Sequence, residues 1–469
     1  MTEQEIVYLD AVTLVDRYRT RTLSPVEAVE AHLDRIARLD PRLNSYVTVT
    51  ADRARQLARE SEARYARGAP KSTIDGVPFA PKDNFATSGI RTTNGSKADA
   101  DRVPAVTATA VARIETAGAI MLGKLNLLEF AMGSGTESGF GPARNPWNLE
   151  REPGGSSSGS GVALASGLAT ITLGTDTGGS IRQPAARCGV TGLKPTYGRV
   201  SRHGVTPLAW TLDHAGPMAR SVRDVARVLP VIAGHDEADA SSAREPVVDY
   251  EAPLATASLR GRTFAVAADL VEPCEPEVRA VFDAAIRHLE TSGARRVDVT
   301  LPHVTAMNIA SEIIINAEFT VYLDERMRDV ERRARIDPTV RLYATSGRFA
   351  LAADYVRAQR LRLQLQAELE VALASADVLV CPTDPTLTGK LGEAARLNGR
   401  EVMWFEYGTL NLGNLTGAPG ISVPCGSTPD GMPVGLQLYG KAFDEARLLA
   451  FAHAYEQSTD WHERRPPLE

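Results

Sequence analysis

The chain has 469 residues, of which 43% are hydrophobic and 23% charged, and its formal net charge is −6. This composition is typical of a soluble globular protein, and the mild acidity argues against nucleic acid as a main partner. No apolar stretch is long enough to span a bilayer, and the acidic start, Met1-Thr-Glu-Gln-Glu-Ile6, does not resemble a signal peptide. We therefore expect a cytoplasmic protein with no membrane partner.

The four cysteines are widely separated and form no Cys-x-x-Cys pair: Cys188, Cys274, Cys381 and Cys425. Such spacing predicts reduced thiols and indicates neither a disulfide framework nor a zinc site.

Residues 11–66 are expected to be mostly helical. Ser24 and Glu27 have the spacing of a capping box, with Pro25 at the first helical position. A short β segment is predicted at 45–50 and a second amphipathic helix at 51–65. This region shows no chemically distinctive pattern, so we interpret it as scaffold.

An apolar, strand-like run, Asp75-Gly-Val-Pro-Phe-Ala-Pro-Lys-Asp-Asn84, places Lys82 at its end. The chain has only seven lysines and uses arginine for most of its positive charge. A desolvated lysine can lose its proton, whereas arginine cannot. Position alone leaves two interpretations open: Lys82 is a base, or it forms a salt bridge with Asp83.

Helix-like and strand-like segments then alternate, which favours a layered α/β fold on a parallel or mixed sheet. We predict one domain over 1–469, with a helical N-terminal region at 1–66, a core at 67–230, a variable, substrate-shaping region at 235–375 and the rest of the core at 376–469. Helix–strand pairs are expected at 107–123, 162–173, 277–300 and 363–381, with two further strands at 419–424 and 433–438 and a closing helix at 444–457.

Two glycine–serine clusters, within 153–160 and 174–180, enclose an apolar helix-and-strand segment. Glycine lets the backbone approach a ligand closely, so two such clusters around a buried segment suggest two loops that meet at one site. A surface loop and a turn are the plain alternative. A phosphate cradle is less favoured, because neither GxxxxGK[ST] nor GxGxxG is present.

Ser180 follows a predicted strand and a glycine-rich turn, which suits a nucleophile with backbone amides nearby. A serine needs a base, and His214 leaves a Ser–His–Asp arrangement possible, with His203 the other histidine near this region. The GxSxG pattern of a nucleophile elbow is absent at Ser180, and the match around Ser157 has no apolar strand before it.

Three segments closely resemble the signature of the amidase signature family: Gly154-Gly-Ser-Ser-Ser-Gly-Ser160, Gly174-Thr-Asp-Thr-Gly-Gly-Ser-Ile-Arg-Gln-Pro-Ala185 and Cys188-Gly-Val-Thr-Gly-Leu-Lys-Pro-Thr-Tyr-Gly-Arg199. Gly76-Val-Pro-Phe-Ala-Pro-Lys-Asp-Asn84 is similar to the lysine motif of that family. The C-terminal segments 417–426 and 433–440 also look like family segments. The resemblance runs from about residue 10 to the end and is weakest over 235–375.

The resemblance implies a Ser–cisSer–Lys triad, with Ser180 as nucleophile, Ser156 as bridging serine and Lys82 as base. Ser157 and Ser158 are less favoured bridging candidates. By the same resemblance, the backbone amides of Thr177, Gly178, Gly179 and Ser180 form the oxyanion hole. The implied fold is an α/β/α sandwich around a central mixed twisted sheet. The chemistry needs no metal and no organic cofactor, and the lysine must be neutral to act as base.

The favoured function is a stand-alone amidohydrolase that cleaves a small aryl or alkyl carboxamide through an acyl-enzyme and releases ammonia or an amine. The main alternative is the glutaminase-type A subunit of a glutamyl-tRNA amidotransferase, which works with partner subunits. Where that subunit usually has Asn-Leu-x-Arg-(Tyr/Phe)-Asp-Gly, this chain reads Asn316-Ala-Glu-Phe-Thr-Val-Tyr-Leu-Asp324. It also has Leu208-Ala-Trp-Thr-Leu-Asp213 where the subunit usually has a pair of small residues before Leu-Asp.

Other family activities, on carbamates, urea-like compounds or esters, stay open because they share the acyl-enzyme step. A non-catalytic family member is disfavoured, because Lys82, Ser156 and Ser180 are all present. Met132, Ile181 and Trp210 are candidates to line the substrate pocket. Homodimers are common in such families, but no sequence feature marks an interface.

Overall fold

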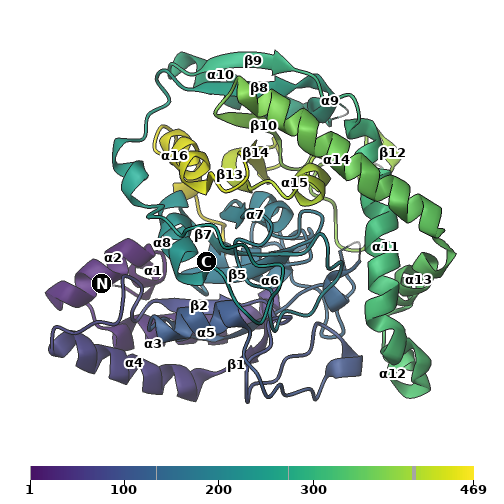
Figure 1. Cartoon of the computed structure of the whole chain (residues 1–469). Helices are drawn as coiled ribbons and strands as arrows, with labels where there is room; N and C mark the ends of the chain where they lie inside the picture. The colour runs from purple at the N-terminus through teal and green to yellow at the C-terminus, as the bar shows by residue number, and fades with distance from the viewer. Residues whose placement is uncertain (1, 134, 273, 404–407, 469) are drawn as a thin grey trace.

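A computed structural model describes residues 2–133, 135–272, 274–403 and 408–468. A ten-stranded mixed sheet crosses the molecule (Figure 1). Its strands are parallel to their neighbours at both ends and antiparallel in the middle. In spatial order they are β3 (Ile120–Met121), β2 (Pro78–Pro81), β5 (Ile171–Asp176), β7 (His214–Ala219), β6 (Thr191–Lys194), β13 (Gly420–Ser427), β14 (Pro433–Tyr439), β10 (Val378–Pro382), β8 (Thr263–Ala267) and β9 (Arg295–Val299). The predicted α/β fold with a mixed sheet is confirmed.

Helices cover both faces of this sheet (Figure 1). Along β13 and β14, Ile421, Val423 and Leu436 belong to the apolar core that includes α16. The alternating residues point the other way, and Gly435 lies against Ala186 of α7. The helices are α1 (Glu3–Val7), α2 (Ala11–Thr20), α3 (Pro25–Leu43), α4 (Ala51–Ala66), α5 (Thr109–Thr116), α6 (Ser158–Ala165), α7 (Arg182–Cys188), α8 (Val222–Ile232), α9 (Ala268–Val271), α10 (Pro276–Thr291), α11 (Val304–Arg328), α12 (Val330–Ala334), α13 (Pro338–Ser346), α14 (Ala352–Ala374), α15 (Asn411–Thr416) and α16 (Glu445–Glu456).

The smaller elements connect these layers. Two-stranded sheets pair β1 (Tyr46–Val49) with β4 (Gly123–Leu125), and β11 (Arg396–Leu397) with β12 (Arg400–Glu401). Single 3₁₀ turns are η1 (Lys97–Asp99), η2 (Glu129–Ala131), η3 (Ala252–Thr256), η4 (Gly347–Phe349) and η5 (Trp461–Glu463). Across the described residues, every helix is too short or too polar to cross a membrane.

The N-terminal helices form as their sequence predicts. Glu27 N donates to Ser24 Oγ at 3.1 Å, and Ser24 N donates to Glu27 Oε2 at 2.7 Å, which together make the predicted capping box of α3. The strands β6 and β7 and the long helix α11 were not predicted. The two strands are short and contain glycine, and α11 carries apolar residues on several faces, which weakens the helical period.

Helices α11 to α14 form an arm at the right-hand edge of the molecule (Figure 1). They share a second apolar core with the far end of the sheet. The core includes Ile315 and Phe319 of α11, Leu365 and Leu369 of α14, and Leu379 of β10. This arm reaches the central strands through α15, so residues far apart in the sequence meet around one cavity.

Candidate active site

A cavity of about 370 Å³ lies beside the two glycine–serine clusters. Ser156, Gly178 and Ser180 belong to its lining, so the two loops expected to meet at one site do meet there. The apolar part of the lining comes from distant segments and consists of Leu128, Ala131, Met132, Leu208, Ile315, Pro385, Ala394, Ala395, Val402, Met403 and Leu410.

Lys82 follows directly on β2, which runs parallel to β5. Its backbone amide donates to Leu173 O at 2.9 Å and fixes it at the carboxyl end of β2, beside the middle of β5. The fully buried Nζ donates to Ser156 Oγ at 2.7 Å and to Thr175 Oγ1 at 2.8 Å. Asn84 Nδ2 also donates to Thr175 Oγ1, at 3.0 Å. The amine is thus held in one orientation against the bridging candidate Ser156.

Burial lowers the pKa of Lys82 from its usual value to about 7, against a weaker opposing effect of Asp176 and Asp213. At neutral pH a large share of the molecules therefore carry Lys82 as a free amine, the form a general base requires. Among the two interpretations left open by position, this geometry favours the base, because Asp83 pairs with Lys124 (Nζ–Oδ1 3.1 Å) instead.

The loop before α6 presents Ser156 to both Lys82 and the cavity. The Gly155–Ser156 peptide bond is cis, and Gly155 N donates to Gln183 Oε1 at 3.2 Å. Gln183 Nε2 in turn donates to Asp384 Oδ2 at 2.9 Å. Gln183, on the first turn of α7, thereby ties the Ser156 loop to the segment that carries Ser180.

The turn between β5 and α7 is organised by the buried carboxylate of Asp176. It accepts from Gly179 N at 2.7 Å and from Ile181 N at 3.1 Å. Gly179 has φ +115°, and an added Cβ would lie 2.4 Å from Leu410 Cδ1, so the turn requires glycine there. The Gly179 amide therefore points into the turn, and the amides of Gly178 and Ser180, both in the cavity wall, make no hydrogen bond within the described residues.

Arg182 holds the Asp176 carboxylate of this turn in place. It donates to both oxygens of Asp176, each at 3.0 Å, and also to Gln437, Tyr439 and Asn414. Burial on its own would raise the pKa of Asp176, but the Arg182 guanidinium outweighs it and holds that pKa well below its usual range. Asp176 is therefore charged at neutral pH, which suits the two hydrogen bonds that it accepts from backbone amides.

Across the residues that the structure describes, neither His214, the alternative base, nor Ser157, an alternative bridging serine, has the hydrogen bonds that its catalytic role would require. His214 is buried, and its Nδ1 lies 2.6 Å from Leu212 O. Burial lowers its pKa well below the usual value. Within the described residues its ring makes no hydrogen bond with Ser180. Ser157 Oγ contacts the backbone of Thr175 instead, at 3.2 and 3.3 Å.

Of the three candidates for pocket lining, the structure places only Met132 in the cavity wall. Ile181 is fully buried on the other side of the turn, where it packs against Gly174, Gly192 and Gly216. Trp210 is 70% exposed and outside the lining. Its segment turns outward because Asp213 accepts from the amides of Leu208 and Ala209 and folds the loop back. Leu208, and not Trp210, is the residue of this loop that enters the wall.

One end of the cavity is polar. Arg187 donates to Glu152, to Asp384 Oδ2 at 2.7 Å and to Thr386 Oγ1 at 3.2 Å. Glu152, Arg187 and Asp384 are all buried, and burial raises the pKa of Glu152 against the attraction of Arg187. Within the described lining Arg187 is the one cation, and two carboxylates already surround it.

Several supporting residues were missed from the sequence, namely Asn84, Glu152, Thr175, Asp176, Gln183, Arg187 and Asp384. Asp176 had a local signal, since an aspartate two or three residues before glycine favours a side-chain-to-backbone turn. The pairing of Arg187 with Asp384 has no local sequence signal, because the two residues are 197 positions apart in the sequence.

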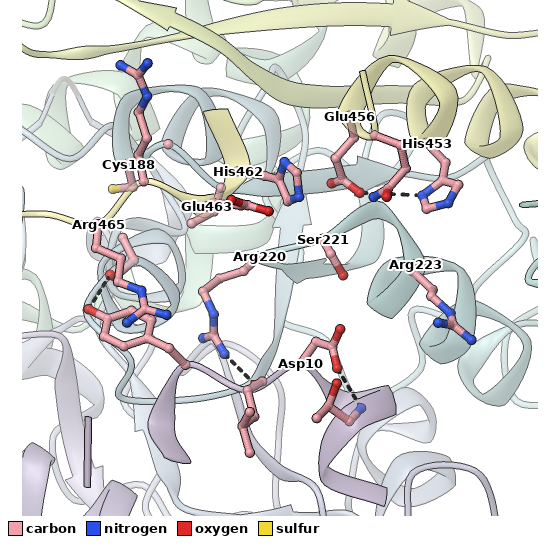
Figure 2. Close-up of a pocket in the computed structure, with 18 of the residues that line it drawn as sticks. Asp10, Cys188, Arg220, Ser221, Arg223, His453, Glu456, His462, Glu463 and Arg465 are labelled. Atoms are coloured by element: carbon pink, nitrogen blue, oxygen red, sulfur yellow. Dashed lines mark hydrogen bonds and ion pairs between the residues drawn. The ribbon is translucent and has the colours of Figure 1, made fainter. Parts of the chain in front are cut away.

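A larger cavity of about 1040 Å³ lies elsewhere, between the N-terminal helices, α8, α16 and residues 461–465 (Figure 2). It contains none of Lys82, Ser156 or Ser180. Arg220, at its centre, donates to the carbonyls of Leu9, Leu164 and Ala169. Cys188, the only thiol in the described lining, has its pKa raised by burial, which disfavours it as a nucleophile. No cluster of three metal-binding side chains occurs within the described ranges.

The chain is similar to known proteins over nearly its whole length. The family profile described as Amidase matches residues 27–449. A curated relative, the A subunit of the glutamyl-tRNA(Gln) amidotransferase of Roseiflexus sp. (strain RS-1), is 45% identical over 95% of both chains. Among solved structures, a bacterial aryl acylamidase of the amidase signature family has a TM-score of 0.89 at 27% identity, covering 97% of both chains. The A subunit of the glutamyl-tRNA(Gln) amidotransferase of Thermotoga maritima has a TM-score of 0.79 at 32% identity, covering 100% of this chain and 98% of the other.

Proposed function

Because this chain belongs to the amidase signature family and is therefore a hydrolase acting on carbon–nitrogen bonds, we propose that its substrate is a small, uncharged aryl or alkyl carboxamide. Ser180 is the nucleophile, Ser156 the bridging serine and Lys82 the base. The product is a carboxylic acid together with ammonia or an amine.

Acylation uses the hydrogen-bonded pair of Lys82 and Ser156. Neutral Lys82 accepts the proton of Ser156 across their 2.7 Å contact, while Ser156 accepts the proton of Ser180. Ser180 Oγ bonds to the carbonyl carbon, and the amides of Gly178 and Ser180 stabilise the resulting oxyanion. When the C–N bond breaks, the proton held by Lys82 returns through Ser156 to the leaving nitrogen.

Deacylation repeats the sequence with water. A water molecule gives its proton to the Ser156–Lys82 pair as its oxygen bonds to the acyl carbon. The bond between that carbon and Ser180 Oγ then breaks, and Ser180 regains a proton from the pair. The buried polar contacts of Asp176, Arg182 and Gln183 keep the two serines and the amides in place through both steps. They raise the rate by holding the reacting groups in the right orientation.

The observation that carries the choice of substrate is the lining of the cavity. Apolar side chains and polar groups share its wall about equally, and its one described cation, Arg187, is already paired with Glu152 and Asp384. The α-carboxylate of glutamine would need a cation that is not already neutralised. Phe319, which stands where the A subunit usually has arginine, is fully buried in an apolar core. A neutral, apolar acyl group fits this cavity better.

The second candidate function is the glutaminase component of a glutamyl-tRNA amidotransferase. Sequence similarity favours it, since the 45%-identical relative carries that name. Structural similarity points the other way, because the TM-score is higher with the aryl acylamidase than with the amidotransferase component. The two functions differ in substrate and in the need for partners, so one assay separates them.

That assay measures ammonia or amine release by the purified single chain from glutamine, asparagine, aliphatic and aryl amides, an anilide, a carbamate and a urea. We expect fast turnover of an alkyl or aryl amide without any added protein. Activity on glutamine alone, or activity only after candidate partner subunits are added, would replace the proposal with the amidotransferase function.

The pH dependence of activity follows from Lys82. Its pKa of about 7 means that the neutral, reactive fraction grows as pH rises through 7. We expect kcat/KM for an apolar amide to rise with pH, with an apparent pKa near 7, and then to level off. A profile that is flat or falls between about pH 6 and pH 8 would contradict a lysine base.

A further inference from the structure

Helix α14 uses one face to pack against the rest of the molecule. The buried residues of that face are Ala358, Leu365, Leu369, Ala372 and Leu373. Two side chains beside them bond the neighbouring α15 segment: Arg362 Nε donates to Leu415 O at 2.9 Å, and Gln366 Nε2 donates to Thr416 O at 3.0 Å. The inner face of α14 is therefore fully occupied.

The opposite face of α14 has a second stripe that the chain itself leaves exposed. Val356 is 55% exposed, Leu363 66% and Val371 74%. The stripe consists of six exposed residues, Val356, Arg360, Leu363, Ala367, Glu370 and Ala374, with Val371 at its edge. Their spacing alternates between four and three residues, which is the pattern of a helix seam that packs against another helix. An apolar stripe on both faces is typical of a helix that is covered on both sides.

The stripe carries two charged side chains, Arg360 and Glu370. Within the described residues, neither of them forms an ion pair. They are ten residues apart, or about 15 Å along the helix, so they cannot reach each other within one chain. Each is flanked by apolar residues of the same stripe, where an unpaired charge would be costly once the stripe is covered.

When a second copy of α14 is placed antiparallel to the first, each residue of the stripe lies opposite a residue with which it can pair. If a second α14 lies antiparallel with its centre at residue 365, Arg360 faces Glu370 of the second copy. In the same register Leu363 faces Ala367 of the second copy, and Val356 faces Ala374. A parallel pair would instead bring like charges together. We propose that this stripe is a homodimer interface, in which α14 pairs antiparallel with α14 of a second copy around a two-fold axis.

The position of α14 permits this pairing. It crosses the upper right of the view in Figure 1, and the described elements it mainly packs against, α11, α15 and β10, leave the stripe exposed. A two-fold axis makes each residue pair occur twice, so two Arg–Glu contacts and two copies of each apolar contact form together. A 23-residue helix is about 34 Å long, which gives an interface at the small end of the stable range. The dimer should therefore dissociate on dilution.

The test is sedimentation velocity of the full chain at about 1 to 100 µM, for which we expect a concentration-dependent dimer. Arg360→Glu and Glu370→Arg, made singly, each place like charges opposite each other and should shift the protein to monomer. The double variant Arg360→Glu/Glu370→Arg restores opposite charges across the interface and should restore the dimer. Since the two positions cannot meet within one chain, this rescue can only arise between two copies.

Leu363→Asp places a charge near the two-fold axis and should also give monomers. The matched control is Val103→Asp, at a residue 57% exposed on a loop outside the arm, which should leave the dimer unchanged. Circular dichroism and thermal unfolding check that all variants stay folded. A monomeric wild type, a Leu363→Asp variant that remains dimeric, or a double charge swap that remains monomeric would each overturn the proposal.

Discussion

Ser180→Ala is expected to reduce kcat by roughly 10⁴-fold or more for any substrate that the wild type hydrolyses. The substitution removes the oxygen that forms the acyl-enzyme and leaves every hydrogen bond of the Asp176 turn in place. Thermal unfolding should therefore be nearly unchanged. The measurement is steady-state product release together with a melting curve of the same preparation.

The matched control is Ser158→Ala. Ser158 is two residues after Ser156, is buried at the start of α6 and lies outside the cavity lining. Its substitution should leave kcat within a few-fold of wild type. A folded Ser180→Ala protein that keeps its activity would eliminate Ser180 as nucleophile, and a large loss in Ser158→Ala would move the bridging role along the loop.

Lys82→Met is expected to abolish turnover and yet to leave the fold at least as stable. Methionine is similar in volume to the lysine side chain but has no amine to accept a proton from Ser156. Because burial lowers the pKa of Lys82 to about 7, keeping this lysine costs the folded protein about 4 kcal/mol at pH 7 relative to an unshifted amine. The Ser156 hydroxyl loses its partner, which offsets about 1–3 kcal/mol of that gain, whereas Thr175 Oγ1 keeps the hydrogen bond that Asn84 donates.

The sign of the effect can be checked by varying pH. The folded-state pKa of Lys82 lies below its unfolded value, so the unfolded state binds more protons between about pH 7 and pH 10.5. The free energy of unfolding of the wild type should rise with pH over that window, and Lys82→Met should lose this slope. Lys82→Arg should be inactive as well, because arginine retains its proton. Activity in either variant would refute Lys82 as the base.

Lys124→Met provides the contrast. Lys124 is equally buried, but its Nζ lies 3.1 Å from Asp83 Oδ1 and donates to Phe85 O at 2.7 Å. Removing it leaves the Asp83 charge buried without its counter-ion, so we expect a large loss of stability, of about 3–5 kcal/mol. Two fully buried lysines are thus expected to respond in opposite directions, because Lys82 serves chemistry and Lys124 serves structure.

Local signals explain what could be predicted from the sequence. The capping box at Ser24 and Glu27 acts through neighbouring residues, so its pattern sufficed. Lys82, Ser156 and Ser180 stand in short motifs, and the structure brings Lys82 and Ser156 into contact and places both serines in one cavity. Their catalytic roles stay predictions until the variants are measured.

Other features depend on contacts that no local pattern encodes. Trp210 has a large apolar side chain of the kind that often lines a pocket. Asp213, however, folds its loop so that Leu208 faces the cavity and Trp210 faces solvent. Glu152, Arg187 and Asp384 form one ionic cluster only because two distant segments, which carry Glu152 and Asp384, meet at α7. The Gly179 amide fits the oxyanion motif, yet it donates to Asp176, and Thr177 lies outside the cavity lining, so Gly178 and Ser180 are the better placed donors.

The most direct test of the account is the mass of the intact chain during reaction with an activated ester of an apolar acid, for which deacylation is slow enough to observe the intermediate. We expect the mass to increase by one acyl group, with peptide mapping placing that group on Ser180, and we expect no such adduct in Ser180→Ala. An adduct on another residue, or steady hydrolysis of the ester by wild-type and Ser180→Ala proteins alike, would contradict the proposed acyl-enzyme mechanism.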